Sequence, residues 1–78
     1  MEWLPLESRM FTAVAYAAES QALWLRFRSG EVYRYFGFPR EMFGEFTNAE
    51  SKGRYFLSHI RDQFRYERLA ILKAVSIS

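Results

Sequence analysis

The sequence predicts a small α+β domain with two layers, in which two α-helices pack on one face of a three-stranded antiparallel β-meander. Between residues 11 and 36, apolar residues alternate with polar or small ones, which is typical of strands. After Gly37 and Pro39 the apolar residues recur every three or four positions, which is typical of helices. A chain of 78 residues is long enough for one domain with a modest core.

Three strands are expected in the first half of the chain, at residues 11–20, 22–28 and 31–36. The second of these has one apolar and one polar face. Its apolar face consists of Leu23, Leu25 and Phe27, and its polar face consists of Trp24, Arg26 and Arg28. The apolar face is expected to lie against the helices.

The register of the second hairpin decides which face Tyr33 and Tyr35 occupy, because a slip of one residue turns every side chain to the other face. A two-residue turn would place both tyrosines on the outer face and Arg34 in the core. A three-residue loop would pair Tyr33 with Leu25 and Tyr35 with Leu23, and would direct Arg34 to solvent. We favour the second register, because burying an unpaired guanidinium is costly. Both tyrosines are then expected to face the core.

Two helices are expected in the second half, at residues 39–47 and 51–64. The second carries apolar residues at four-residue spacing, namely Phe56, Ile60 and Phe64. Asn48 or Ser51 can cap it. The apolar tail, residues 69–78, can extend a helix, pair as a strand or contact another chain.

The composition narrows the classes of function. The chain has no cysteine, so it has no disulfide and no thiolate metal site, and we expect a reducing, cytoplasmic location. It has no signal-like start and no run of about 20 apolar residues, so no membrane association is expected. The single histidine, His59, does not make a zinc site, and helical spacing from Ser58 and Asp62 does not give the geometry of a catalytic triad. We therefore expect no enzyme, metal or cofactor.

The second half of the chain is basic, which suggests an anionic partner. Residues 51–68 carry five basic residues against two acidic ones. Arg61, Arg65 and Arg68 recur at helical spacing and predict a basic ridge, although such residues also pair with local acids. Lys52 and Arg54 flank Gly53 at an expected helix start, where free amides and two cations can bind a phosphate. The alternative explanation of Gly53 is close helix packing.

The polar face of the second strand is a candidate nucleic-acid surface. Trp24, Arg26 and Arg28 face away from the core in either register, and Arg34 joins them in the favoured one. A tryptophan among arginines can stack on bases while the guanidinium groups contact phosphates. Alternatively, Trp24 covers neighbouring apolar surface and the arginines keep the face soluble.

Three segments together resemble one known family. They are Ser8 with "AVAY" at 13–16, "LWLRFRSGEVYRYFGFP" at 23–39, and "NAESKGRYFLSHIR" at 48–61. This ordered set resembles the KTSC domain, a small module named after the C-terminus of some lysyl-tRNA synthetases and also found alone in bacteria. The residues that match the family motifs are Tyr33, Tyr35, Ser51, Lys52, Gly53, Arg54, Tyr55 and Phe56.

The resemblance covers residues 3–68 and leaves 69–78 as a C-terminal extension. The sequence departs from the family at Ala17, where an acidic residue is common, and at Leu57, where asparagine is common. If that asparagine contacts a ligand in the family, this chain lacks the contact. Through its synthetase context, the resemblance implies a role in RNA binding.

We therefore expect a non-catalytic module that binds nucleic acid, and we favour RNA as its ligand. The expected contact residues are Trp24, Arg26, Arg28, Arg34, Lys52, Arg54 and Arg61. The alternative is a protein-interaction module that is anchored by Trp24 or by the apolar tail.

Overall fold

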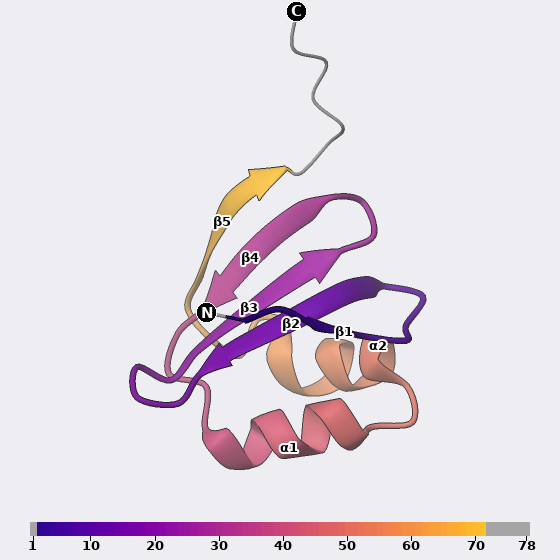
Figure 1. The fold of residues 1–78 in the computed structure, drawn as a ribbon. Coiled ribbons are helices and arrows are strands. Elements are labelled where there is room, and N and C mark those ends of the chain that lie inside the picture. Colours follow the sequence, from indigo (N-terminus) through magenta and orange to yellow (C-terminus); the bar gives the residue numbers. More distant parts are fainter. Residues whose placement is uncertain (1, 72–78) are drawn as a thin grey trace, which may run out of the picture.

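Five antiparallel strands form one open sheet in the computed structural model, which describes residues 2–71 (Figure 1). The strands are β1 (Leu4–Pro5), β2 (Phe11–Ala17), β3 (Ala22–Phe27), β4 (Glu31–Tyr35) and β5 (Tyr66–Ile71). They lie side by side in chain order. The expected three-stranded meander is present as β2–β4, but the expectation of three strands is wrong because β1 and β5 extend the sheet at its two edges.

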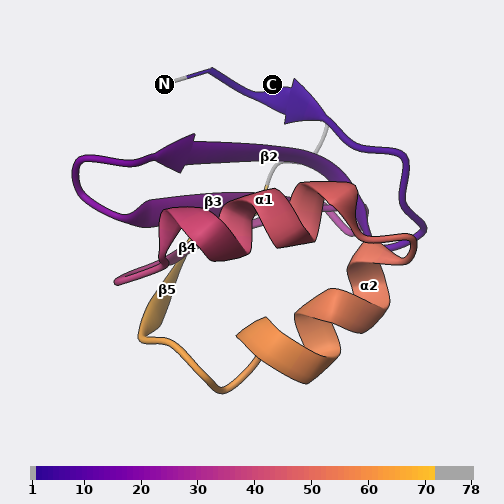
Figure 2. The same cartoon turned by 90° about the horizontal axis from the view of Figure 1, so that it is seen from below.

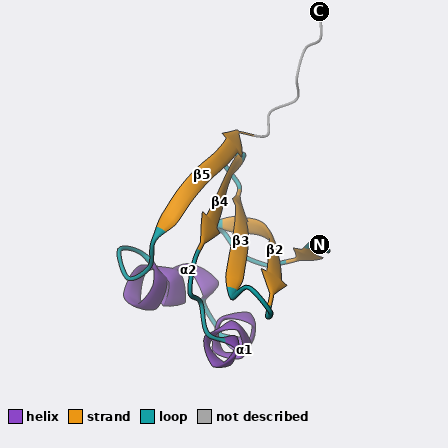
Figure 3. Cartoon of the chain, turned by 90° about the vertical axis from the view of Figure 1, so that its left-hand side faces the viewer, coloured by secondary structure: helices purple, strands orange, loops and turns teal. Residues whose placement is uncertain are grey.

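Both helices lie on the same side of this sheet, as expected for two layers (Figures 2 and 3). Helix α1 spans Arg40–Asn48, and α2 spans Lys52–Tyr55 and continues into the π-helical turn η1, Phe56–Ile60. In residues 2–71, no helix has the length and apolar character needed to cross a membrane.

The favoured hairpin register is confirmed. Leu23 pairs with Tyr35 and Leu25 pairs with Tyr33 across β3 and β4. The loop is closed by Gly30, whose φ of 99° suits glycine and whose amide donates to the Phe27 carbonyl at 2.9 Å. Both tyrosines therefore face the helices, as expected.

The core is rich in aromatic rings, which lets a short chain bury much apolar area. Phe11 is fully buried, and its ring centroid lies 4.8 Å from that of Phe27, 5.7 Å from that of Phe46 and 5.3 Å from that of Phe56. These rings join β2, β3, α1 and η1 into one core. Tyr35 belongs to it and is only 4% exposed.

The second helical segment ends at Ile60, four residues before the expected end. Arg61 leaves helical geometry with ψ 129°, and Asp62 has φ 62°, a left-handed conformation that aspartate tolerates better than most residues. The expected basic ridge is therefore wrong. Arg61 lies at the helix end, Arg65 lies in the following loop, and Arg68 lies on β5 with its Nη1 3.4 Å from Glu31 Oε2.

Part of the apolar tail pairs as a strand, which was one of the three alternatives. β5 runs antiparallel to β4 from Tyr66 to Ile71, so it joins the end of the expected domain (3–68) to the start of the expected extension (69–78). The remainder of the tail, 72–78, lies outside the described residues.

Candidate functional site

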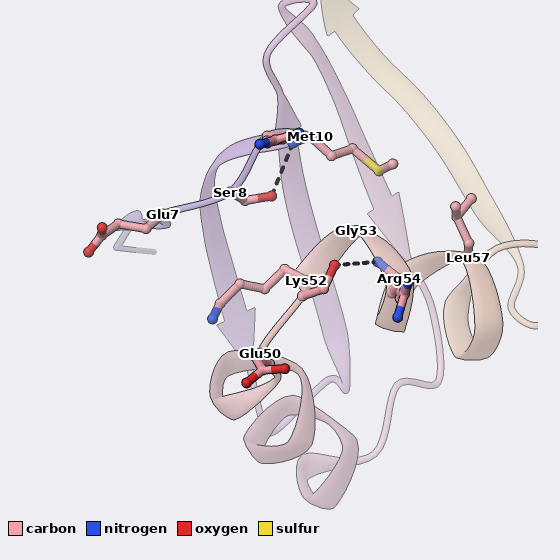
Figure 4. Close-up of a pocket in the computed structure, with 10 residues that line it drawn as sticks. Glu7, Ser8, Met10, Glu50, Lys52, Gly53, Arg54 and Leu57 are labelled. Atoms are coloured by element: carbon pink, nitrogen blue, oxygen red, sulfur yellow. Dashed lines mark hydrogen bonds between the residues drawn. The ribbon is translucent and has the colours of Figure 1, made fainter.

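An open groove with a volume of about 750 Å³ lies between the segment that joins β1 to β2 and the start of α2 (Figure 4). Its first wall is formed by residues 7–10, and its second by residues 50–54 and Leu57. We call it the basic groove.

A local hydrogen-bond motif shapes the first wall. Ser8 Oγ accepts hydrogen bonds from the amides of Met10 at 3.0 Å and Phe11 at 3.2 Å. Serine favours such turns because its hydroxyl can satisfy nearby backbone amides. The turn places Met10 against the second wall, where a Cβ at Gly53 would lie 3.5 Å from Met10 Cε.

The second wall is fixed by a helix cap. Ser51 Oγ accepts from the Arg54 amide at 3.2 Å, which confirms Ser51 as the cap. One amide expected to be free for an anion is therefore already bonded. Lys52 Nζ donates to the Ala49 carbonyl at 2.9 Å and keeps its charge at the groove (Figure 4).

The groove carries an excess of basic side chains. Arg9, Lys52 and Arg54 line it together with two glutamates. Arg28 lies beside it, because its Nε donates to the Ser8 carbonyl at 2.8 Å. Within residues 2–69, none of these four cations has a carboxylate within ion-pair distance. The arrangement can therefore attract a phosphate or another anion.

The outer sheet face offers fewer free groups than the sequence suggests. Trp24 is half-buried and pairs across the sheet with Ala15, which is fully buried. The Arg26 guanidinium lies 4.9 Å from the centroid of the Trp3 ring, and its Nε is buried without a hydrogen-bond partner in the described part of the chain. Trp24 and Arg26 thus cover apolar surface of β2 and β3.

Arg34 is also engaged by its neighbours. It points away from the helices, as expected, and forms an ion pair with Glu67 of β5. Its guanidinium lies 5.0 Å from the centroid of the Phe36 ring. A base or phosphate would have to compete with these contacts.

The tyrosines of the family motif line a second hollow, with a volume of about 300 Å³. We call it the tyrosine pocket; its lining residues are Phe27, Glu31, Tyr33, Tyr35, Phe56, Arg61, Asp62 and Tyr66. Burial raises the pKa of Tyr35 far above its ordinary value. Arg61 belongs to this pocket and not to the basic groove.

Tyr55 stabilises the helical segment between the two hollows. Its hydroxyl donates to Glu45 Oε1 at 2.6 Å, and its ring stacks on His59 with centroids 4.5 Å apart. Burial, followed by the hydrogen bond to Glu45, raises the pKa of Tyr55 to about 12. His59 is exposed and packs here as a ring.

The predicted contact residues are thus divided among three places. Lys52, Arg54 and Arg28 gather at the basic groove, Trp24, Arg26 and Arg34 lie on the outer sheet face, and Arg61 lies at the tyrosine pocket. Sequence reasoning did not select Arg9 or Tyr66. Arg9 directly follows Ser8, which is part of the family resemblance, and this position could have indicated that Arg9 belongs to the site.

The fold and the two hollows define a small two-layer α+β domain with a basic groove near the start of α2 and an aromatic pocket near the end of η1. Residues 7–64 match the KTSC domain. The chain belongs to the KTSC domain family, so the resemblance seen in the sequence is confirmed.

Proteins similar to this chain include a ligase, a small uncharacterized protein and a KTSC domain protein of known structure. A lysine–tRNA ligase from Nostoc sp. is 42% identical over 64 residues, which cover 82% of this chain and 11% of that protein. An uncharacterized protein from Stutzerimonas stutzeri is 34% identical over 70 residues and covers 88% of this chain and 99% of that protein. The crystal structure of a KTSC domain protein from Yersinia pestis has a TM-score of 0.86 and 28% identity and covers 88% of this chain and 97% of that chain. The chain thus spans about a tenth of the length of the ligase that it matches.

Proposed function

We propose that this chain is a non-catalytic RNA-binding module that holds the phosphate backbone in the basic groove. One observation carries the proposal. Two segments about 40 positions apart in the sequence bring Arg9, Lys52 and Arg54 to one groove, and Arg28 lies at its side. Because these cations form no ion pair with a carboxylate of residues 2–69, they do not have to break one in order to bind phosphate. Their binding also releases counterions from the nucleic acid.

The family supports an RNA ligand. Relatives of this chain include lysine–tRNA ligases, which act on tRNA by name. The outer sheet face supplies secondary contacts in this proposal, because Arg26 and Arg34 are already packed on rings and Arg34 is paired with Glu67. Phosphate contacts of this kind position the RNA without reading its sequence.

The test is fluorescence anisotropy with a labelled single-stranded RNA of mixed sequence, over a series of salt concentrations. For single strands the slope of log affinity against log salt is about −0.7 per neutralised phosphate, so four cations predict a slope of about −2.8. Changing Arg9 and Arg54 to glutamine removes two of them and should bring the slope to about −1.4. Arg40→Gln, an exposed position on α1 outside the groove, is the matched control and should leave the slope unchanged.

Two results would count against the proposal. One is the absence of binding to single-stranded RNA and to an RNA hairpin at low salt. The other is a loss of slope in the Arg40→Gln control that equals the loss per removed charge in the double change, which would mean that net charge alone attracts the RNA.

A further inference from the structure

The tyrosine pocket presents flat aromatic surface that the groove-binding proposal does not use. The ring of Tyr66 lies with its centroid 5.5 Å from that of Tyr33 and 5.8 Å from that of Tyr35. Tyr66 is 55% exposed, so part of its ring remains open to solvent at the mouth of the pocket. Aromatic side chains arranged in this way can stack on planar ligands.

The side chain of Tyr35 also lines the pocket. Tyr35 is only 4% exposed, and within residues 2–69 its hydroxyl makes no hydrogen bond, although it is not among the fully buried polar atoms that lack a partner. A tyrosine hydroxyl can donate a hydrogen bond, so an acceptor atom on a ligand can bind there.

The rim of the pocket has both hydrogen-bond donors and acceptors. Arg61 supplies a guanidinium and Asp62 a carboxylate, and these groups are 3.9 Å apart and mostly exposed. Glu31 adds a second carboxylate, which Arg68 partly neutralises at 3.4 Å. This mixture of charges does not favour a simple anion or a simple cation. It suits a neutral ring whose edge both donates and accepts hydrogen bonds.

The pocket lies next to the basic groove along the chain. Phe56 lines the tyrosine pocket and its neighbour Leu57 lines the groove. Likewise, Phe27 lines the pocket, whereas Arg28 donates to Ser8 at the groove. Two chain segments therefore connect the hollows, which places a ring-binding site beside a phosphate-binding site.

We propose that the tyrosine pocket binds one unstacked nucleobase of a single-stranded RNA, with its ring against Tyr66 and Tyr33 and its edge toward Tyr35, Arg61 and Asp62. This inference rests on the proposed function, because it assigns the base contact of the same RNA ligand. The volume of about 300 Å³ is at the lower end for ligand pockets, which suits a single base. Proteins commonly recognise single-stranded RNA by stacking splayed bases on aromatic rings.

The test uses nucleosides, which carry no phosphate and so do not require the basic groove. Adenosine, guanosine, cytidine and uridine are titrated to millimolar concentration against the full chain, and the aromatic signals of the tyrosines are followed by NMR. We expect saturable shifts at Tyr33 and Tyr66. Tyr66→Ala should weaken binding by about 5- to 150-fold, the value of one base stack, whereas Tyr66→Phe should retain most of the affinity.

The controls separate this inference from the proposed function. Leu69→Ala changes an exposed residue of the same strand outside the pocket and should leave nucleoside binding intact. The double change of Arg9 and Arg54 to glutamine should weaken RNA binding but not nucleoside binding. RNA binding without nucleoside shifts at the tyrosines would overturn the base pocket and leave the proposed function standing. Saturable binding of tetramethylammonium in place of nucleosides would also overturn it, because it would identify a cation site.

Discussion

Replacing Gly53 by alanine tests why a glycine stands in the wall of the basic groove. Gly53 lies in α2 and is not among the residues with positive φ. An added Cβ would lie 3.5 Å from Met10 Cε and 3.7 Å from Met10 Cβ, which is ordinary van der Waals contact. Neither backbone strain nor close packing therefore requires glycine here.

The expected result is a gain in stability. Alanine is favoured over glycine inside a helix by about 0.5–1 kcal/mol, because glycine loses more backbone entropy on folding. For a domain of this size that gain should raise the melting temperature by about 2–8 °C. Urea denaturation and thermal melting followed by circular dichroism measure both quantities.

The same substitution at Gly37 is the matched control. Gly37 has φ 69°, so Gly37→Ala should destabilise the chain by about 1 kcal/mol, although its Cβ would meet no atom within 4 Å. A loss of more than about 1 kcal/mol in Gly53→Ala would refute the reasoning, because it would show that the contact with Met10 cannot accept a methyl group.

Three further predictions follow from local contacts. Ser8→Ala removes the acceptor for two amides and should cost about 1–2 kcal/mol in urea denaturation, whereas Ser8→Thr should cost less. The pKa of Tyr55 is raised to about 12, so its contribution to the free energy of unfolding is complete below pH 10 and is lost as the pH rises from 10 to 12. Tyr55→Phe lacks the hydrogen bond to Glu45, so its free energy of unfolding should fall less than that of the unchanged chain over this range. A double-mutant cycle on Arg34 and Glu67 should give a coupling of about 0.2–1 kcal/mol that decreases in 1 M salt, and a coupling unaffected by salt would contradict an exposed ion pair.

The sequence was sufficient to predict the central hairpin and the two-layer arrangement. The burial cost of Arg34 selected the register, and the structure directs that residue to the outer face. The acceptor that it meets there, Glu67, lies on β5, which was not expected as a strand beside β4. The register could be predicted from the burial cost of Arg34 because that cost is a property of one side chain, and the argument did not require the position of β5.

The edge strands could not be predicted in the same way. β1 has only two residues, Leu4–Pro5, which is too short for any periodicity. β5 was obscured because residues 61–68 continue the helical spacing of the arginines, and neither glycine nor proline marks the break. The turn depends on the left-handed conformation of Asp62, which several residue types disfavour but aspartate tolerates.

The candidate sites were predicted only in part. Lys52 and Arg54 were selected from their spacing around Gly53, but the opposite wall comes from residues 7–10, and a sequence does not show which distant segments meet. The tyrosines were correctly expected to face inward. They line a pocket because β5, which follows η1 in the chain, begins at Tyr66 and adds this residue to the lining. The sequence did not predict this strand.

Amide chemical-shift mapping with a short single-stranded RNA tests most directly whether the basic groove is the RNA contact. We predict that the largest shifts occur in residues 7–10 and 50–57, with smaller shifts around the tyrosine pocket, and that added salt reverses them. Shifts confined to Trp24 and Arg26 on the outer sheet face, with none in the groove, would contradict the account.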